Sequence, residues 1–248
     1  MEMIDLSRLE PQETLNHTSK GNQLKWKCYG YWYKADHMGY EGLAETIVSA
    51  LLGKSTVKYP FVAYEYSQIK YKDRVYSGCK SVDFLADGYD LIPLEKLYRK
   101  FTGGSLAVDT AHQGEIKNQI KFLVNFVEQT TGLQNFGQYL TSMLEIDAFF
   151  LNEDRHTNNI AVQYNAADDT YALCPLFDNG LSLFGDTNMD FPLERSLEDC
   201  LKAVEVKSLS RYFDDQLDAA EELYGIQLHF NFNTNDVKAV SYTHLTLP

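Results

Sequence analysis

The first third of the chain carries the spacing of a small sheet. Leu24–Cys28 and Tyr31–Asp36 flank the turn-like pair Tyr29-Gly30, and their many aromatic residues predict a β-hairpin. Alternation along the two strands predicts one face made of Trp26, Cys28, Trp32 and Lys34. Other strands are expected near Met3–Leu9, over Val57–Tyr66 and within Tyr71–Phe84.

An amphipathic helix is predicted between these strands. From position 40 to position 52, hydrophobic residues recur at intervals of three and four, which is the period of one helix face. They are Tyr40, Leu43, Ala44, Ile47, Val48, Leu51 and Leu52. Gly53 follows directly and predicts the end of the helix.

The second half of the chain is mostly helical by the same criterion. Helical spacing covers Glu115–Thr131, Phe136–Leu151, Leu193–Leu209 and Arg211–Tyr224, with acidic residues on the outer face of the last two. Two short strands, Ile160–Tyr164 and Tyr171–Pro175, enclose a polar turn. Glycines and a proline interrupt Lys80–Gly104, which we interpret as the boundary between two lobes.

These patterns predict an α+β protein of two lobes. A small strand-rich N-lobe is expected over residues 1–85, and a mostly helical C-lobe over residues 86–238. Ala239–Pro248 fits no predicted element and resembles a translated sequencing-adapter tail. We therefore interpret residues 239–248 as non-native and expect the natural C-terminus to be truncated.

Composition excludes several classes of protein. Of 248 residues, 44% are hydrophobic and 23% charged, which is typical of a globular chain and not of a disordered one. No apolar run approaches ~18 residues, and no basic segment precedes an apolar one at the N-terminus, so neither a membrane span nor a signal peptide is expected. The cysteines form no CxxC pair, which favours reduced thiols in a cytoplasmic protein: Cys28, Cys79, Cys174 and Cys200.

The charge is unevenly distributed. A net charge of −13 disfavours nonspecific binding to nucleic acid or to an anionic membrane. Residues 19–80 nevertheless hold ten Lys/Arg and five Asp/Glu, a local charge of +5. Such a region suits an anionic ligand such as a nucleotide phosphate, or it reflects lysines gathered by chance at strand edges; charge alone does not separate the two.

The segment with the clearest chemistry is Asn152–Ile160, which follows a predicted helix and precedes a strand. It contains Asp154 and, five positions later, Asn159; after the predicted strand pair comes Asp178, in the run Phe177-Asp178-Asn179-Gly180. An aspartate suits the acceptance of a proton from an attacking hydroxyl group. The Asn159 amide oxygen and the Asp178 carboxylate are hard ligands suited to Mg²⁺. The layout therefore predicts phosphoryl transfer.

The Asp154-Arg155-His156-x-x-Asn159 string, with Asp178-Asn179-Gly180 downstream, resembles the catalytic and metal-binding loops of the HipA-like kinases. The same DRHxxN pattern occurs in phosphoinositide-type lipid kinases. The resemblance implies a bilobal protein-kinase-like fold, ATP and Mg²⁺ as ligands, Asp154 as catalytic base, and Asn159 and Asp178 as metal ligands.

Kinase folds also place a lysine on the third strand, where it contacts nucleotide phosphates and pairs with a glutamate of the next helix. Lys34 ends the predicted strand and is the candidate for this lysine. The helix offers Glu41 and Glu45, four residues apart on one face. Glu45 lies deeper in the apolar pattern and resembles the family helix better, while Glu41 remains an alternative.

A polar loop precedes the predicted hairpin at the position of a phosphate-binding loop. It contains Ser19, Lys20, Gly21 and Asn22, whose backbone N–H groups would cradle a phosphate while Lys20 adds positive charge. The loop resembles the corresponding Ser/Gly/Gln-containing loop of HipA-like kinases. An ordinary polar turn is the alternative interpretation.

Together these features predict an ATP- and Mg²⁺-dependent kinase that phosphorylates a hydroxyl group, with Ser or Thr of a protein as the favoured acceptor. The alternatives are a lipid or small-molecule kinase and, in another class, a pseudokinase that binds nucleotide as an interaction module. Leu181–Glu194 lacks Lys and Arg, which disfavours anionic lipid headgroups. The chain begins near the phosphate loop, so the extra N-terminal domain of HipA toxins is not expected, which disfavours an antitoxin partner.

Overall fold

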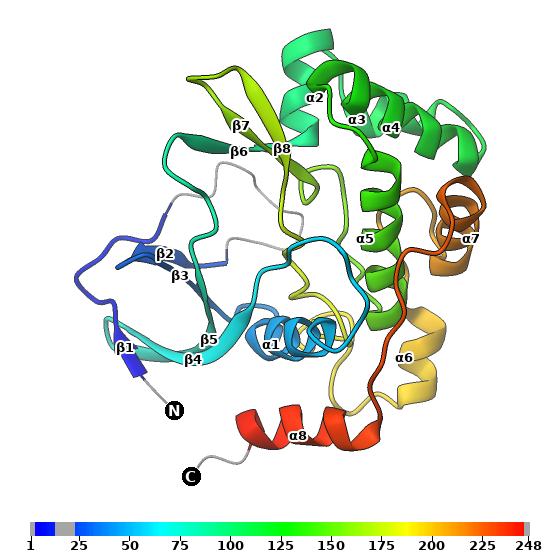
Figure 1. The fold of residues 1–248 in the computed structure, drawn as a ribbon. Helices are drawn as coiled ribbons and strands as arrows, with labels where there is room; N and C mark the ends of the chain where they lie inside the picture. Colours follow the sequence, from blue (N-terminus) through cyan, green and yellow to red (C-terminus); the bar gives the residue numbers. More distant parts are fainter. Residues whose placement is uncertain (1–2, 13–22, 246–248) are drawn as a thin grey trace.

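The computed structural model describes residues 3–12 and 23–245, with side chains as far as residue 240. The N-lobe contains a five-stranded sheet in the order β1-β4-β5-β3-β2 (Figure 1). All neighbouring strands are antiparallel except β1 and β4, which are parallel. The strands are β1 (Met3–Asp5), β2 (Lys25–Cys28), β3 (Tyr31–Ala35), β4 (Tyr64–Tyr71) and β5 (Arg74–Val82).

The predicted hairpin is present as β2 and β3. Tyr29 and Gly30 both have positive φ angles, 51° and 79°, as the two central residues of a type I′ turn require. The predicted faces were wrong, because the register pairs Trp26 with Tyr33 and Lys25 with Lys34. Even-numbered residues of one strand therefore share a face of the sheet with odd-numbered residues of the other strand. Trp26 is buried in the sheet's own core, and Lys34 lies on the opposite face beside Lys25.

Helix α1 (Glu41–Leu52) lies against β4 and β5, as the hydrophobic period predicted. The two elements approach closely because both carry a glycine at the contact: a Cβ atom on Gly42 would lie 2.6 Å from the Cα of Gly78. Leu51 and Leu52 continue into the core of the helical lobe. The helix therefore links the sheet to the rest of the molecule.

The predicted strand over Val57–Tyr66 was only partly correct. The ladder begins at Tyr64 and continues to Tyr71, whereas the earlier residues form isolated contacts such as the bridge between Phe61 and Leu176. Pro60 cannot donate a backbone hydrogen bond, which is consistent with an extended segment that lies outside the sheet.

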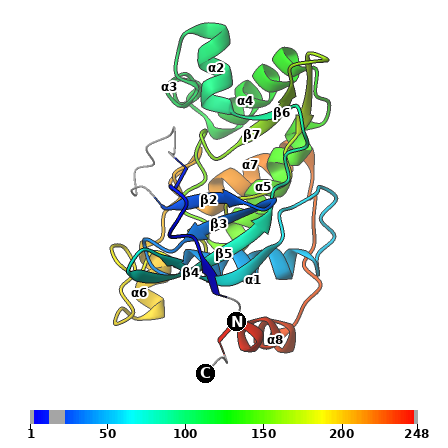
Figure 2. The ribbon, with the colours of Figure 1, turned by 90° about the vertical axis from the view of Figure 1, so that its left-hand side faces the viewer.

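The C-lobe combines helices with a three-stranded antiparallel sheet in the order β6-β7-β8. Helices α2, α3 and α4 lie beside this sheet, while α5 runs through the middle of the lobe with α7 against it (Figures 1 and 2). The elements are β6 (Tyr89–Pro93), α2 (Leu94–Thr102), α3 (Leu106–Ala111), α4 (Ile116–Thr131), α5 (Phe136–Phe150), β7 (Ala161–Asn165), β8 (Thr170–Leu173), α6 (Leu197–Ala203) and α7 (Phe213–Tyr224). The last helix, α8 (Thr234–Leu245), returns to lie against α1 (Figure 1).

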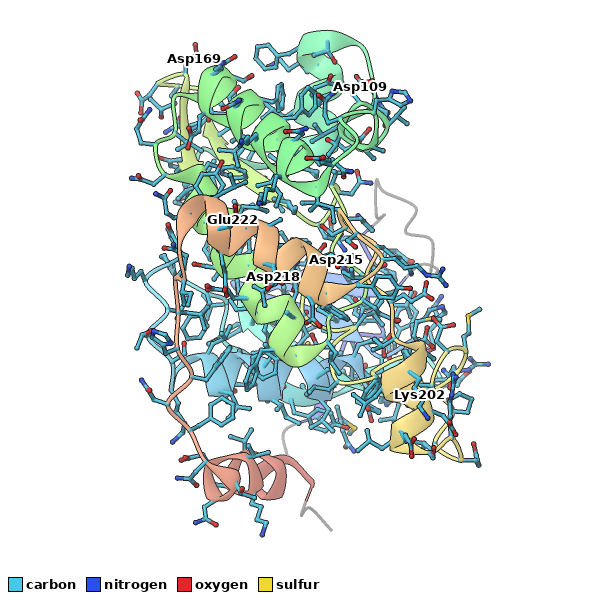
Figure 3. The ribbon with its side chains drawn as sticks, turned by 90° about the vertical axis from the view of Figure 1, so that its right-hand side faces the viewer. Asp109, Asp169, Lys202, Asp215, Asp218 and Glu222 are labelled. Atoms are coloured by element: carbon cyan, nitrogen blue, oxygen red, sulfur yellow. The ribbon has the colours of Figure 1, made fainter. Side chains whose placement is uncertain are left out.

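Helix α4 ends at Gly132 in the left-handed conformation, and α5 is buried along most of its length. Helix α7 carries exposed acids on its outer side, among them Asp215, Asp218 and Glu222 (Figure 3). Both features agree with the hydrophobic pattern. In the part of the chain that the structure describes, no helix combines the length and hydropathy needed to cross a membrane.

Two predictions for the C-terminal part of the chain were wrong, one in extent and one in kind. The pattern over Leu193–Leu209 gives only the short helix α6, because its evenly spaced leucines do not face a core: Leu193 is 79% exposed and Leu197 65%. Ala239–Pro248 was expected to fit no element, yet α8 extends to Leu245. Asp236 supports the start of α8 by accepting the N–H of Asn233 (2.9 Å).

The glycine contact between α1 and β5 can be tested by substitution. Gly42→Ala is expected to lower the free energy of unfolding by about 1–3 kcal/mol, because the added methyl group forces helix and strand apart. Urea unfolding followed by circular dichroism measures the change. Gly53→Ala is the control, since Gly53 has a helical φ of −61° and its added Cβ would lie 3.3 Å from the Ala50 oxygen. Equal stability of Gly42→Ala and the wild type would contradict the close approach.

Candidate active site at the lobe interface

An ion pair joins the sheet to helix α1. The Lys34 Nζ, at the end of β3, donates to Glu45 Oε1 at 2.7 Å, and Glu45 is almost completely buried. Glu41 does not take this place: its carboxylate accepts backbone N–H groups of the preceding turn, including Met38 at 2.5 Å and Gly39 at 3.0 Å. The geometry thus favours Glu45 over Glu41 as the partner of Lys34.

Asp178 completes a three-membered charge cluster. Lys34 Nζ also lies 3.0 Å from Asp178 Oδ1, although 144 residues separate the two in sequence. The second oxygen of Glu45 accepts the backbone N–H of Asn179 at 2.9 Å. Each oxygen of Glu45 therefore has a different role, since one holds the lysine and the other holds the loop that carries Asp178.

The cluster stays charged despite its burial. Burial alone would raise the pKa of Asp178, but the ammonium groups of Lys34 and Lys25 outweigh it and hold that pKa below its usual range. Burial would likewise lower the pKa of Lys34, and the carboxylates of Asp178 and Glu45 raise it well above its usual value. Burial lowers the pKa of Lys25, and the attraction of the Asp178 and Glu45 carboxylates offsets this only in part. The site therefore holds the positive charge of Lys34 beside the negative charge of Asp178.

Asp178 has an unusual backbone conformation. Its φ is 65°, in the left-handed region that most non-glycine residues avoid. The hydrogen bond from Asn179 to Glu45 keeps the loop close to α1, and a Cβ on Gly180 would lie 3.2 Å from the Glu41 Cβ. The loop therefore follows a tight path under α1, which directs the Asp178 carboxylate toward Lys34.

The predicted catalytic loop closes on itself around Asp154. The Asn159 Nδ2 donates to the Asp154 backbone oxygen at 2.8 Å and lies 3.4 Å from the Asp154 Oδ2. Asn152 orients the start of the loop, because its Oδ1 accepts the N–H of Asp154 at 3.3 Å. Asp154 and Asn159, five residues apart, are thus brought side by side.

Arg155 holds the two predicted loops together. Its guanidinium forms a two-point ion pair with Asp147 of α5, with Nε–Oδ2 2.8 Å and Nη2–Oδ1 3.0 Å. The same group donates to the Asn159 backbone oxygen at 3.3 Å, to the Phe177 oxygen at 2.9 Å and to Asn179 Oδ1 at 2.9 Å. One buried side chain therefore connects α5, the Asp154 loop and the Asp178 loop.

The donor set near these loops fits a divalent cation. The Asp178 carboxylate and the side-chain oxygen of Asn159 are hard ligands, and the Asn159 nitrogen is engaged with Asp154, which leaves its oxygen as the group available to a metal. Arg155 bonds to the backbone on either side of the strand pair β7–β8, so the hairpin and the arginine together join the two ligand-bearing loops.

Three parts of the site were not predicted from sequence. Asp147 was a detectable candidate, since an acid in the otherwise apolar helix over 136–151 needs a buried partner. Lys25 lies opposite Lys34 in the hairpin register. Lys207, from the segment after α6, lies 3.4 Å from the Asp154 Oδ1 and had no local signal. The predicted phosphate loop with Ser19, Lys20, Gly21 and Asn22 lies outside the described residues.

Comparison with known proteins agrees with this architecture. No family model and no curated protein matches the sequence. Among solved structures, the crystal structure of the proinflammatory kinase CtkA of Helicobacter pylori is similar to this chain, with a TM-score of 0.65. The match covers 100% of this chain and 89% of that chain at 15% sequence identity. At this identity the likeness is one of fold, and it confirms the predicted bilobal, kinase-like α+β architecture.

The role of Arg155 as a connector gives a stability prediction. Arg155→Met is expected to lower the free energy of unfolding by about 3–5 kcal/mol, because it leaves the Asp147 carboxylate buried without its cation. Arg155→Lys should recover only part of this loss, since an ammonium group cannot reproduce the two-point pair and the three further bonds.

Urea unfolding measures both variants. Arg99→Met is the control, because Arg99 is 69% exposed and lies 3.8 Å from Glu95, and surface pairs of this kind contribute about 0–1 kcal/mol. A loss for Arg155→Met no larger than that of the control would show that the guanidinium does not hold the loops together.

Proposed function

We propose that this protein is a kinase that transfers the γ-phosphate of ATP to a hydroxyl group, with Ser or Thr of a protein as acceptor. The observation that carries the proposal is the cluster in which Lys34 contacts both Glu45 and Asp178. Three separate elements, a strand, a helix and a loop, converge on one ammonium group, in a fold that resembles a kinase. A solvated surface lysine would not lie between two carboxylates, one of which is almost completely buried.

In this proposal Lys34 binds the phosphates of ATP, and Glu45 keeps the Lys34 side chain in position. The loop with Ser19, Lys20, Gly21 and Asn22 would cover the phosphates with backbone N–H groups. We assign residues 1–85 to the ATP-binding lobe and residues 86–238 to the lobe that carries the catalytic and metal-binding loops. In this proposal the reaction takes place where these two lobes meet.

Asp154 is proposed as the base. The acceptor oxygen attacks the γ-phosphorus, the bond to the β-phosphate oxygen breaks with its electron pair leaving on ADP, and the hydroxyl proton passes to the Asp154 carboxylate. Asn159 and Asp178 would hold Mg²⁺, which neutralises phosphate charge when bound. The buried Arg155 side chain keeps the two loops that carry the base and these ligands in one geometry.

A protein acceptor is favoured over a lipid by charge. The segment 181–194, which follows the Asp178 loop, contains Asp186, Asp190 and Glu194 and no basic residue. Anionic headgroups would be repelled there, whereas membrane-associated segments attract them with clusters of Lys and Arg.

The base assignment is tested with Asp154→Asn. The change removes proton acceptance while nearly preserving shape, so transfer is expected to fall by about 10²–10⁴-fold. Transfer of the labelled γ-phosphate of ATP is measured with two acceptors in parallel. One is a degenerate peptide library with a fixed Ser or Thr, and the other is phosphatidylinositol vesicles. Thermal stabilisation by ATP and Mg²⁺ should match that of the wild type.

Undiminished transfer by Asp154→Asn would contradict the assignment. Label on the vesicles alone would favour the lipid kinase. If ATP stabilises the wild type but no acceptor is labelled, the protein is a nucleotide-binding interaction module and the proposed activity is wrong.

The Lys34–Glu45 pair is tested by a double-mutant cycle. Lys34→Met and Glu45→Gln should each reduce turnover strongly, and the double variant should be little worse than either, because Glu45 acts through Lys34. Glu41→Gln is the matched control on the same helix, and its effect should simply add to that of Lys34→Met, since the Glu41 carboxylate accepts the backbone N–H groups of the preceding turn. Coupling of Glu41 instead of Glu45 to Lys34 would overturn the pairing.

A further inference from the structure

A second cation approaches the proposed base from a distant part of the chain. The Lys207 Nζ lies 3.4 Å from Asp154 Oδ1, and 53 residues separate the two. The other oxygen of Asp154 faces the loop itself, with the Asn159 Nδ2 at 3.4 Å and the His156 Nε2 at 3.8 Å. The carboxylate therefore has one oxygen held by its own loop and one that faces Lys207.

Lys207 differs from the other cations of the site in how strongly it is held. Lys34 lies between two carboxylates at 2.7 and 3.0 Å, and the Arg155 guanidinium is buried among four bonding partners. Lys207 makes a long contact to Asp154, and its side chain is 40% exposed. Its ammonium group can therefore exchange Asp154 for another anion at little cost.

The backbone under Lys207 is anchored although the side chain is exposed. Val206 is buried, and its N–H donates to the carbonyl oxygen of Arg211 at 3.1 Å, which closes the segment between α6 and α7. The Lys207 side chain thus extends from an anchored backbone to a position beside Asp154.

Lys207 also lines a cavity next to the proposed base. The cavity has a volume of about 290 Å³, and its other walls include Glu153, Asp190, Phe191 and Arg195. Glu153 precedes Asp154 in the chain, and Lys207 both lines the cavity and contacts Asp154 Oδ1 at 3.4 Å. The Lys207 ammonium therefore lies between the cavity and the proposed base.

We propose that Lys207 is a catalytic residue that binds an oxygen of the γ-phosphoryl group during transfer. The proposal rests on the phosphotransfer function argued above. As the acceptor oxygen bonds to phosphorus and ADP leaves with the electron pair of the broken bond, negative charge is spread over the transferring oxygens. Lys207 binds these oxygens, leaves Asp154 Oδ1 free to take the hydroxyl proton, and offsets the negative charge with its ammonium group. Charged donors placed where negative charge develops contribute mostly in the transition state.

The kinetic test compares Lys207→Met, Lys207→Arg and Lys202→Met. Lys207→Met is expected to lower kcat by about 10²–10³-fold, with the KM for ATP within about twofold, because the lost interaction belongs to the transition state. Lys207→Arg keeps the charge and should recover roughly tenfold or more of the loss. Lys202 is the control: it projects from α6 into solvent (Figure 3), is 68% exposed and pairs with Glu198 at 2.6 Å.

A binding measurement separates catalysis from folding. Thermal stabilisation by ADP with Mg²⁺ should be equal in wild type and Lys207→Met, which shows that the variant is folded. Adding aluminium fluoride, which mimics the transferring phosphoryl group beside ADP, should stabilise the wild type further and Lys207→Met much less.

If Lys207→Met had the kcat of the wild type, or the same extra stabilisation by aluminium fluoride with ADP, the proposed role of Lys207 would be wrong. The proposed kinase function would be unaffected by that result. If the wild type neither transfers label nor responds to ADP with fluoride, both the kinase function and the role of Lys207 are wrong. A loss in Lys202→Met equal to that in Lys207→Met would also contradict a specific role.

Discussion

The site depends on the burial of one carboxylate, that of Glu45. A buried charge is costly unless both its oxygens find partners, and here one oxygen binds the Lys34 ammonium and the other the N–H of Asn179. These two bonds join β3, α1 and the Asp178 loop. Because α1 also shares its apolar side with the core of the helical lobe, the position of Glu45 sets the position of one lobe relative to the other.

A second buried ion pair, between Asp147 and Arg155, joins separate elements inside the C-lobe. The apolar helix α5 carries Asp147, and only a cation with several donors can satisfy that carboxylate and still reach two loops. Arg155 does so from within the Asp154 loop. Its bonds to the Asn159 and Phe177 oxygens use backbone groups that a hairpin of different length would place elsewhere. The 19-residue interval between Asn159 and Asp178 is therefore a structural requirement as well as a motif spacing.

Sequence reasoning worked where one local signal was sufficient. The hydrophobic period identified α1, α4, α5 and α7, since each of these helices buries one face or more against a core. It was only partly correct at Leu193–Leu209, where Leu193, Leu197 and Leu201 have helical spacing but are exposed. It also missed the helix that includes part of Ala239–Pro248, which forms without a strong apolar period. It also assigned the faces of the hairpin wrongly, because register depends on the turn and not on counting within each strand.

The amino-acid pattern was sufficient to predict the fold class and to select the residues that carry the proposed chemistry, because residue type and short-range spacing specify which groups can accept a proton, hold a metal or bind phosphate. The choice of Glu45 over Glu41 was decided by tertiary structure, since two glutamates one turn apart differ only in what packs around them. The same holds for Arg155 as connector and for Lys207 beside Asp154. Their partners lie on other elements, and only the packing of α5, α6 and the two loops brings those groups within bonding distance.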